Sequence, residues 1–195
     1  TQNVRDALVD VSGGGDAFTA VPVQGSGTFA VEAMVGTFLP KDRKLLIVVN
    51  GAYGHRIAKI CDYMARRYKV LETPEDTLPD VGAISRTLAD DPDISHVVVI
   101  HCETTSGILN PVEDIAAAVA AENRRLLIDA MSAFGAIPLN LTRISCDAVA
   151  ASSNKCFEGV PGIGFVLCRK ASLEETKGNA HSLSLDLFDQ WQAME

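Results

Sequence analysis

The chain has 195 residues, a length that suits one domain with a substantial hydrophobic core. Hydrophobic residues make up 47% and charged residues 22%, and the formal net charge is -8, which argues against nucleic acids and anionic membranes as main partners. No apolar run approaches the length of a membrane span.

The first part of the chain alternates short apolar runs with segments of helical spacing. It predicts a strand at 17–24, a helix at 28–39 and a strand rich in β-branched residues at 44–50. Helical spacing follows over 53–68, with one apolar face made by Ile57, Ile60, Cys61 and Met64.

The same alternation continues to the end of the chain, with a long apolar strand and a helix that has Pro111 at its start. In chain order we expect a strand at 69–73, a helix at 81–90, a strand at 96–103, a helix at 111–123, and strands at 125–130, 147–152 and 164–170. Apolar strands interleaved with helices indicate an α/β fold, in which a mostly parallel sheet is flanked by helices on both faces.

The five cysteines are an odd number, and no two of them form a C-x-x-C pair. This pattern argues against a disulfide framework or a zinc site and favours a reducing compartment, so we expect a cytoplasmic protein. His101, Cys102 and Glu103 are three ligand-type residues in a row, but neighbouring strand residues point to opposite faces. We therefore expect no metal site.

The first candidate site is the segment Gly25–Thr28, between a predicted strand and a predicted helix. Glycines let a ligand approach the backbone, and the free N–H groups at a helix start favour an anion, with Ser26 and Thr28 adding hydroxyl groups. The segment matches neither the Walker motif nor the G-x-G-x-x-G fingerprint. A phosphate cup and an ordinary turn with a helix cap both remain open.

Two charged residues follow predicted strands further along the chain. Asp129 ends the strand at 125–130, where ligands of α/β sheets bind, although an acid that caps a turn is common. Lys155 lies just past the strand at 147–152, in a loop that contains Gly159 and Gly162, and could also be a surface lysine. Local pattern alone leaves both alternatives open for each residue.

The anion cup, the acid and the lysine together match the groups that one cofactor requires. Pyridoxal 5'-phosphate (PLP) needs a cup for its phosphate, a carboxylate beside its ring nitrogen and a lysine for its Schiff base. The carboxylate keeps the ring nitrogen protonated, so that the ring can withdraw electrons. Asp129 and Lys155 would serve as the catalytic pair.

The sequence resembles the fold-type I, class V PLP-dependent aminotransferases, and within them the 2-aminoethylphosphonate–pyruvate aminotransferases. Six stretches carry the resemblance in the expected order: QGSGTFAVEA, LLIVVNGAYGHR, HCETTSGILNP, IDAMSAFGAIPLN, SSNKCFEGVPG and SLSLDLFDQW. The resemblance implies transamination between 2-aminoethylphosphonate and pyruvate, which gives phosphonoacetaldehyde and alanine in phosphonate catabolism.

The resemblance also implies cofactor-binding roles for particular residues. The matching positions are Ser26, Gly27 and Thr28 at the phosphate, Tyr53 stacked on the ring, Thr105 at the phenolic oxygen, Asn154 near the phosphate, and Asp129 and Lys155 as above. Thr104 is a weaker candidate for the hydroxyl role. A small-molecule amine and a 2-oxo acid would be the substrates, and a homodimer with the site near its interface would be the assembly.

The resemblance further implies that residues 1–195 form a single PLP-binding large domain, cut at both ends and without the family's C-terminal small domain. That small domain supplies an arginine for the acidic group of the substrate. Three alternatives stay open: another enzyme of this fold, such as an alanine–glyoxylate or serine–pyruvate aminotransferase or a cysteine desulfurase; a PLP-binding domain without turnover; and a nucleotide-binding α/β domain.

Overall fold

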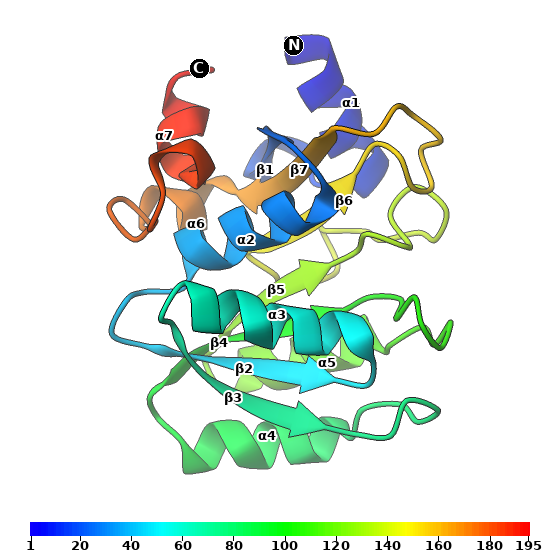
Figure 1. The fold of residues 1–195 in the computed structure, drawn as a ribbon, viewed down its shortest axis with the longest axis vertical. Helices are drawn as coiled ribbons and strands as arrows, with labels where there is room; N and C mark the ends of the chain where they lie inside the picture. Colours follow the sequence, from blue (N-terminus) through cyan, green and yellow to red (C-terminus); the bar gives the residue numbers. More distant parts are fainter.

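Seven strands form one mixed sheet in the computed structural model, which describes residues 1–195 (Figure 1). Their order across the sheet is β1-β7-β6-β5-β4-β2-β3. The strands are β1 (Phe18–Gln24), β2 (Lys44–Val49), β3 (Arg67–Glu72), β4 (Ile94–Ile100), β5 (Arg125–Asp129), β6 (Ala148–Ser152) and β7 (Ile163–Arg169). The strands from β6 to β3 pair in parallel, whereas β7 runs antiparallel to both β1 and β6. The expected mostly parallel sheet is confirmed.

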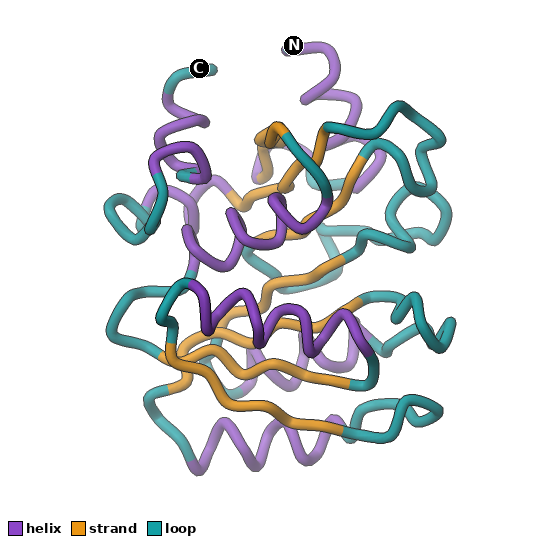
Figure 2. The backbone as a smooth tube through the Cα atoms, in the orientation of Figure 1, coloured by secondary structure: helices purple, strands orange, loops and turns teal.

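Helices cover both faces of the sheet, as the tube view shows (Figure 2). They are α1 (Gln2–Ser12), α2 (Gly27–Phe38), α3 (Ala52–Tyr63), α4 (Val81–Asp90), α5 (Val112–Ala121), α6 (Lys170–Glu174) and α7 (Leu187–Gln192). Buried side chains of α2, α3 and α7 pack on one face, and those of α4 and α5 pack on the other. None of these helices combines the length and the apolar character that a membrane crossing requires.

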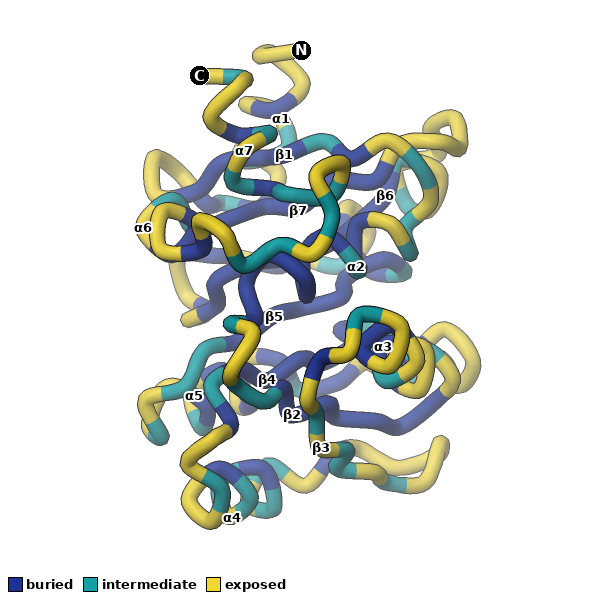
Figure 3. The backbone as a smooth tube through the Cα atoms, turned by 60° about the vertical axis from the view of Figure 1, so that its left-hand side comes forward, coloured by how far each residue is buried: buried dark blue, intermediate teal, exposed yellow.

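Six of the seven strands are buried along most of their length, because helices cover both faces, whereas the edge strand β3 stays partly exposed (Figure 3). Successive strand residues point to opposite faces, so Val98 and Leu127 join the core under α2 and α3, while Val97 and Leu126 join the core under α4 and α5. This arrangement explains why the strands appear in the sequence as continuous apolar runs and not as alternating ones.

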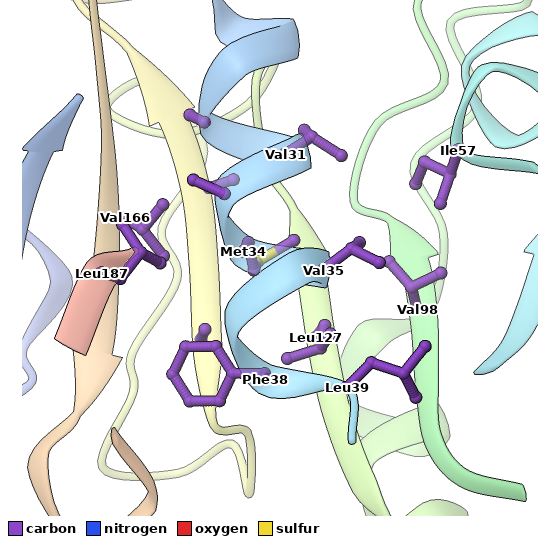
Figure 4. Close-up of a cluster of buried hydrophobic side chains, with 14 of the residues drawn as sticks. Val31, Met34, Val35, Phe38, Leu39, Ile57, Val98, Leu127, Val166 and Leu187 are labelled. Atoms are coloured by element: carbon purple, nitrogen blue, oxygen red, sulfur yellow. The ribbon is translucent and has the colours of Figure 1, made fainter. Parts of the chain in front are cut away.

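Helix α2 is buried on nearly every side, which fits a helix that is apolar all round. Its side chains Val31, Met34, Val35 and Phe38 lie over the sheet between α3 and the start of α7 (Figure 4). The N-terminus of this helix is therefore held firmly against the centre of the sheet, where it can form one wall of a site.

Helix α3 is shorter than the sequence predicts, because it ends at Tyr63 and not at residue 68. Ala65 adopts a left-handed conformation with φ 52°, and the Arg66 amide donates to the Cys61 carbonyl at 2.8 Å. This is the hydrogen-bond pattern that closes many helices. Strand β3 then begins at Arg67, two residues before the predicted strand.

The sequence analysis also did not predict the helices α1, α6 and α7.

The contact between α2 and β7 depends on Gly164. A Cβ atom at this position would lie 2.9 Å from the Ala30 Cβ and 3.3 Å from the Ser26 carbonyl oxygen. We expect Gly164→Ala to push the start of α2 away from the sheet and to lower the free energy of unfolding by about 1–3 kcal/mol, measured by urea denaturation.

The matched control is Gly82→Ala, on helix α4. A Cβ at Gly82 meets only the flexible ends of Arg86 and Asp80, at 3.1 and 3.2 Å. Since alanine favours a helix more than glycine does, this variant should keep its stability or gain up to about 1 kcal/mol. An unchanged stability in Gly164→Ala would show that α2 is not tightly packed on β7.

Candidate active site

Seven of the eight residues predicted at the cofactor site line a single cavity at the carboxyl ends of β5 and β6. Parallel α/β sheets bind ligands at this edge, where the loops after the strands meet the starts of helices. The lining residues are Ser26, Gly27, Thr28, Val31, Tyr53, Arg56, Ile57, Ile60, Asp129, Met131, Ser152, Asn154 and Lys155.

The start of α2 forms one wall of the cavity. Gly25 has φ 126°, a conformation that favours glycine, and it turns the chain from β1 into the helix. Gly27 leaves room for Met131, since a Cβ there would stand 2.5 Å from the Met131 sulfur. Ser26 occupies the N-cap position, yet its side chain makes no capping hydrogen bond. Its hydroxyl and the first amides of α2 are therefore free to bind an anion.

Asp129 ends strand β5 and is only 4% exposed. Its Oδ1 accepts a hydrogen bond from the Met131 amide at 2.9 Å. Burial raises the pKa of Asp129 to about 6 against the lowering effect of the Met131 amide, and the charge of Glu103 raises it further. The charges of Arg56 and Lys155 lower the pKa of Asp129 to a smaller extent, but neither residue forms an ion pair with this buried carboxyl group.

Lys155 lies in the connection from β6 to β7, close to the carboxyl end of β6. This connection is closed by hydrogen bonds from the Ser153 amide to the Ile163 carbonyl at 3.1 Å and from the Gly159 amide to the Ser153 carbonyl at 2.8 Å. The Lys155 side chain forms no ion pair and no hydrogen bond, so its amine is free at the cavity. Asn154 lines the cavity beside it.

Tyr53 and Arg56 come from the first turns of α3 and line the cavity together. The guanidinium carbon of Arg56 lies 4.8 Å from the centre of the Tyr53 ring, within the range of a cation–π contact. The sequence analysis did not identify Arg56. The signal was present, because residues three apart on a helix share a face and Tyr53 was already a candidate.

Thr105 is the one predicted residue that does not line the cavity. Its hydroxyl donates to Glu103 Oε1 at 3.1 Å and accepts from the Ala52 amide at 3.4 Å. The hydroxyl of Thr104 lies 2.6 Å from that of Ser132. Met131 and Ser152, which do line the cavity, were not predicted.

The family model for class-V aminotransferases matches residues 2–185 of the chain. The chain belongs to the class-V aminotransferase family. Among curated proteins it is 53% identical over 196 residues to "2-aminoethylphosphonate--pyruvate transaminase 1" of Paraburkholderia xenovorans, which covers 100% of this chain and 50% of that protein. A 2-aminoethylphosphonate–pyruvate transaminase of Pseudomonas aeruginosa is 52% identical over 97% of the chain and 51% of its own length.

Solved structures of other aminotransferases share the fold described above. Ureidoglycine–glyoxylate aminotransferase from Bacillus subtilis superposes with a TM-score of 0.91 at 19% identity, over 100% of this chain and 50% of that one. Pyridoxamine–pyruvate aminotransferase from Mesorhizobium loti gives 0.86 at 24% identity, over 97% and 50%. At these identities the likeness concerns the fold alone. The chain spans about half the length of the relatives that it matches.

Family membership assigns PLP as the cofactor, and the residues at the cavity suit it. The buried carboxyl group of Asp129 forms no ion pair within the chain, and a protonated ring nitrogen would supply one. The free hydroxyl of Ser26 at the start of α2 suits a phosphate, and the unpaired amine of Lys155 suits an aldehyde. These three groups differ in chemistry, and one molecule of PLP has a complement for each.

Proposed function

We propose that the whole protein transfers the amino group of 2-aminoethylphosphonate to pyruvate, which gives phosphonoacetaldehyde and alanine. The support comes from curated relatives that are 50–53% identical over 97–100% of the chain and carry this activity in their names. The family is established independently of the substrate, so aminotransfer between an amine and a 2-oxo acid is the broader part of the proposal.

One structural observation carries the proposal: a free amine, a buried carboxyl group and an open helix N-terminus line the same cavity. Ser26 lies more than 100 residues before Asp129 and Lys155 in the chain. The fold brings all three residues together at this cavity. The alternative of a nucleotide-binding domain has no need of the lysine or of the buried acid.

The side chains at the cavity divide the chemistry between them. When bound, PLP supplies an aldehyde that takes up amino groups and a ring that withdraws electrons from the carbon next to the amine nitrogen. The carboxylate of Asp129 would keep the ring nitrogen protonated. Lys155 Nζ would hold the cofactor aldehyde, and the same amine, once free, would carry a proton from and to the substrate carbon.

The remaining residues would hold the cofactor and orient its ring. Ser26, Gly27 and Thr28 would bind the phosphate through hydroxyl and amide groups at the start of α2, and Asn154 would add a polar side chain nearby. Tyr53 would stack on the ring, and the Arg56 guanidinium lies against Tyr53. The resemblance implies a contact of Thr105 with the phenolic oxygen, but its hydroxyl donates to Glu103 Oε1 and the residue does not line the cavity. We place the protein in the cytoplasm, consistent with five free cysteines, and as a homodimer with the site near its interface.

The experiment that tests the proposal supplies the protein with PLP and 2-aminoethylphosphonate, first without and then with pyruvate. We expect phosphonoacetaldehyde in both cases, in amounts limited to one per site without pyruvate, and alanine only with pyruvate. Glyoxylate with alanine as the donor serves as the comparison pair. Faster transfer from alanine to glyoxylate would support an alanine–glyoxylate aminotransferase instead, and PLP binding without any transfer would support a domain without turnover.

A further inference from the structure

Glu103 is a fully buried carboxyl group that the sequence analysis left without a role. Its exposed fraction is 0%, and it lies three residues beyond the end of β4. It forms no ion pair with any lysine, arginine or histidine of the chain. A buried carboxylate without a cation is costly, so the contacts that it makes in return define what it does.

All three hydrogen bonds of the Glu103 side chain go to groups beside the cofactor cavity. Oε2 accepts from the Tyr53 amide at 3.3 Å, and Oε1 accepts from the Thr105 amide at 3.4 Å and from the Thr105 hydroxyl at 3.1 Å. The first bond satisfies one of the free amides at the start of α3. Glu103 therefore links the helix turn that carries Tyr53 to the loop that carries Thr105.

The side chain of Glu103 packs against Gly51. A Cβ at Gly51 would lie 2.3 Å from the Glu103 Cγ, so the carboxyl group passes directly over this glycine. The main chain is fixed as well, because the Glu103 amide donates to the Ile108 carbonyl at 2.9 Å and the Gly107 amide donates to the Glu103 carbonyl at 2.7 Å. Packing and main-chain hydrogen bonds therefore both hold Glu103 in place between Tyr53 and Thr105.

Glu103 also acts on Asp129 through its charge. It is the neighbouring charge that raises the pKa of Asp129, in addition to burial. Asp129 thus feels the negative charge of Glu103 behind the cavity wall, while the charges of Arg56 and Lys155 at the cavity act on it in the opposite sense. The charge of Glu103 favours a cation beside Asp129.

We propose that Glu103 is a positioning residue of the cofactor site, which holds Tyr53 and Thr105 in place and adds a second negative charge beside the one on Asp129. The inference rests on the proposed function, since the cation concerned is the protonated, lysine-bound cofactor. Glu103 does not line the cavity and acts through its neighbours.

The test is Glu103→Gln, which keeps the shape of the side chain and removes its charge. We expect the dissociation constant of PLP to rise about tenfold, as expected for the loss of one hydrogen bond to a charged group. The visible band of the lysine-bound cofactor changes with pH, and we expect its midpoint to fall by roughly half a unit to one unit, because a nearby negative charge no longer favours the protonated form.

The matched control is Glu174→Gln, an exposed glutamate of α6, which should leave both quantities unchanged. Glu103→Asp keeps the charge but shortens the side chain, so it should preserve the midpoint and alter the circular dichroism of the bound cofactor. It also provides a measurement if the glutamine variant does not fold. A Glu103→Gln protein with a lower melting temperature and an unchanged midpoint would reduce Glu103 to a packing role and overturn the inference. No cofactor band in the unsubstituted protein would instead overturn the proposed function, and this inference with it.

Discussion

Lys155→Ala should abolish the visible absorbance band of the lysine-bound cofactor and lower turnover by about 10⁴-fold or more, because one side chain provides both the nucleophile and the proton carrier. The Lys155 amine has no partner in the chain, so its removal breaks no contact of the fold. The thermal stability of the protein without cofactor should therefore stay close to that of the unsubstituted protein.

Borohydride reduction gives a second readout that does not depend on turnover. It should fix the cofactor on the unsubstituted protein, and peptide mass mapping should place it on the peptide that contains Lys155. Lys177→Ala, at an exposed lysine far along the chain, is the control and should behave like the unsubstituted protein. If Lys155→Ala keeps the band, or if the reduced cofactor maps to another lysine, the assignment of Lys155 is wrong.

Asp129→Asn should retain much of the PLP binding and lower the rate of transfer by about 10²- to 10³-fold. Asparagine can still accept the hydrogen bond from the Met131 amide, so the local geometry is kept. It cannot carry the negative charge that holds a proton at the ring nitrogen. Single-turnover kinetics with 2-aminoethylphosphonate would separate this effect on the chemical step from any change in binding.

The same substitution should stabilise the protein that lacks cofactor. The pKa of Asp129 is raised from 3.8 to about 6 in the folded chain, so the neutral form favours folding. That stability is fully present below about pH 4 and is lost as the pH rises through 6. Asparagine is neutral at every pH, and the variant should be more stable at pH 8 by about 3 kcal/mol, with a gap that closes near pH 4. Urea denaturation at several pH values would measure the gap, and a constant gap would contradict the assignment.

Much of the fold was predictable because most of the strands are buried on both faces. Runs such as VVVI (97–100) and LLI (126–128) are apolar throughout, which marks them as strands of a covered parallel sheet. The end of α3 was not predictable in this way, since the left-handed turn falls on Ala65 and not on a glycine. The antiparallel direction of β7 follows from pairing across the sheet, and no local pattern records it.

Candidate site residues could be predicted from the sequence where a residue of suitable chemistry stands at the end of an apolar strand. Asp129 ends an apolar strand, Lys155 and Ser26 each follow one, and the fold brings all three to one cavity. Glu103 could not be identified, because its position in the sequence resembles that of any polar residue after a strand. Only the packing against Gly51 and the bond to Tyr53 reveal its surroundings.

The closed connection between β6 and β7 has a consequence for how the protein tolerates changes in length. Strands β6 and β7 are antiparallel neighbours, so the number of residues between Ser153 and Ile163 constrains the position of the Lys155 amine. One inserted residue there would displace the amine. The connections that enter the strands at the opposite edge of the sheet, such as residues 91–93 before β4, can lengthen without moving it. Insertions and deletions in related sequences should therefore collect at that distant edge.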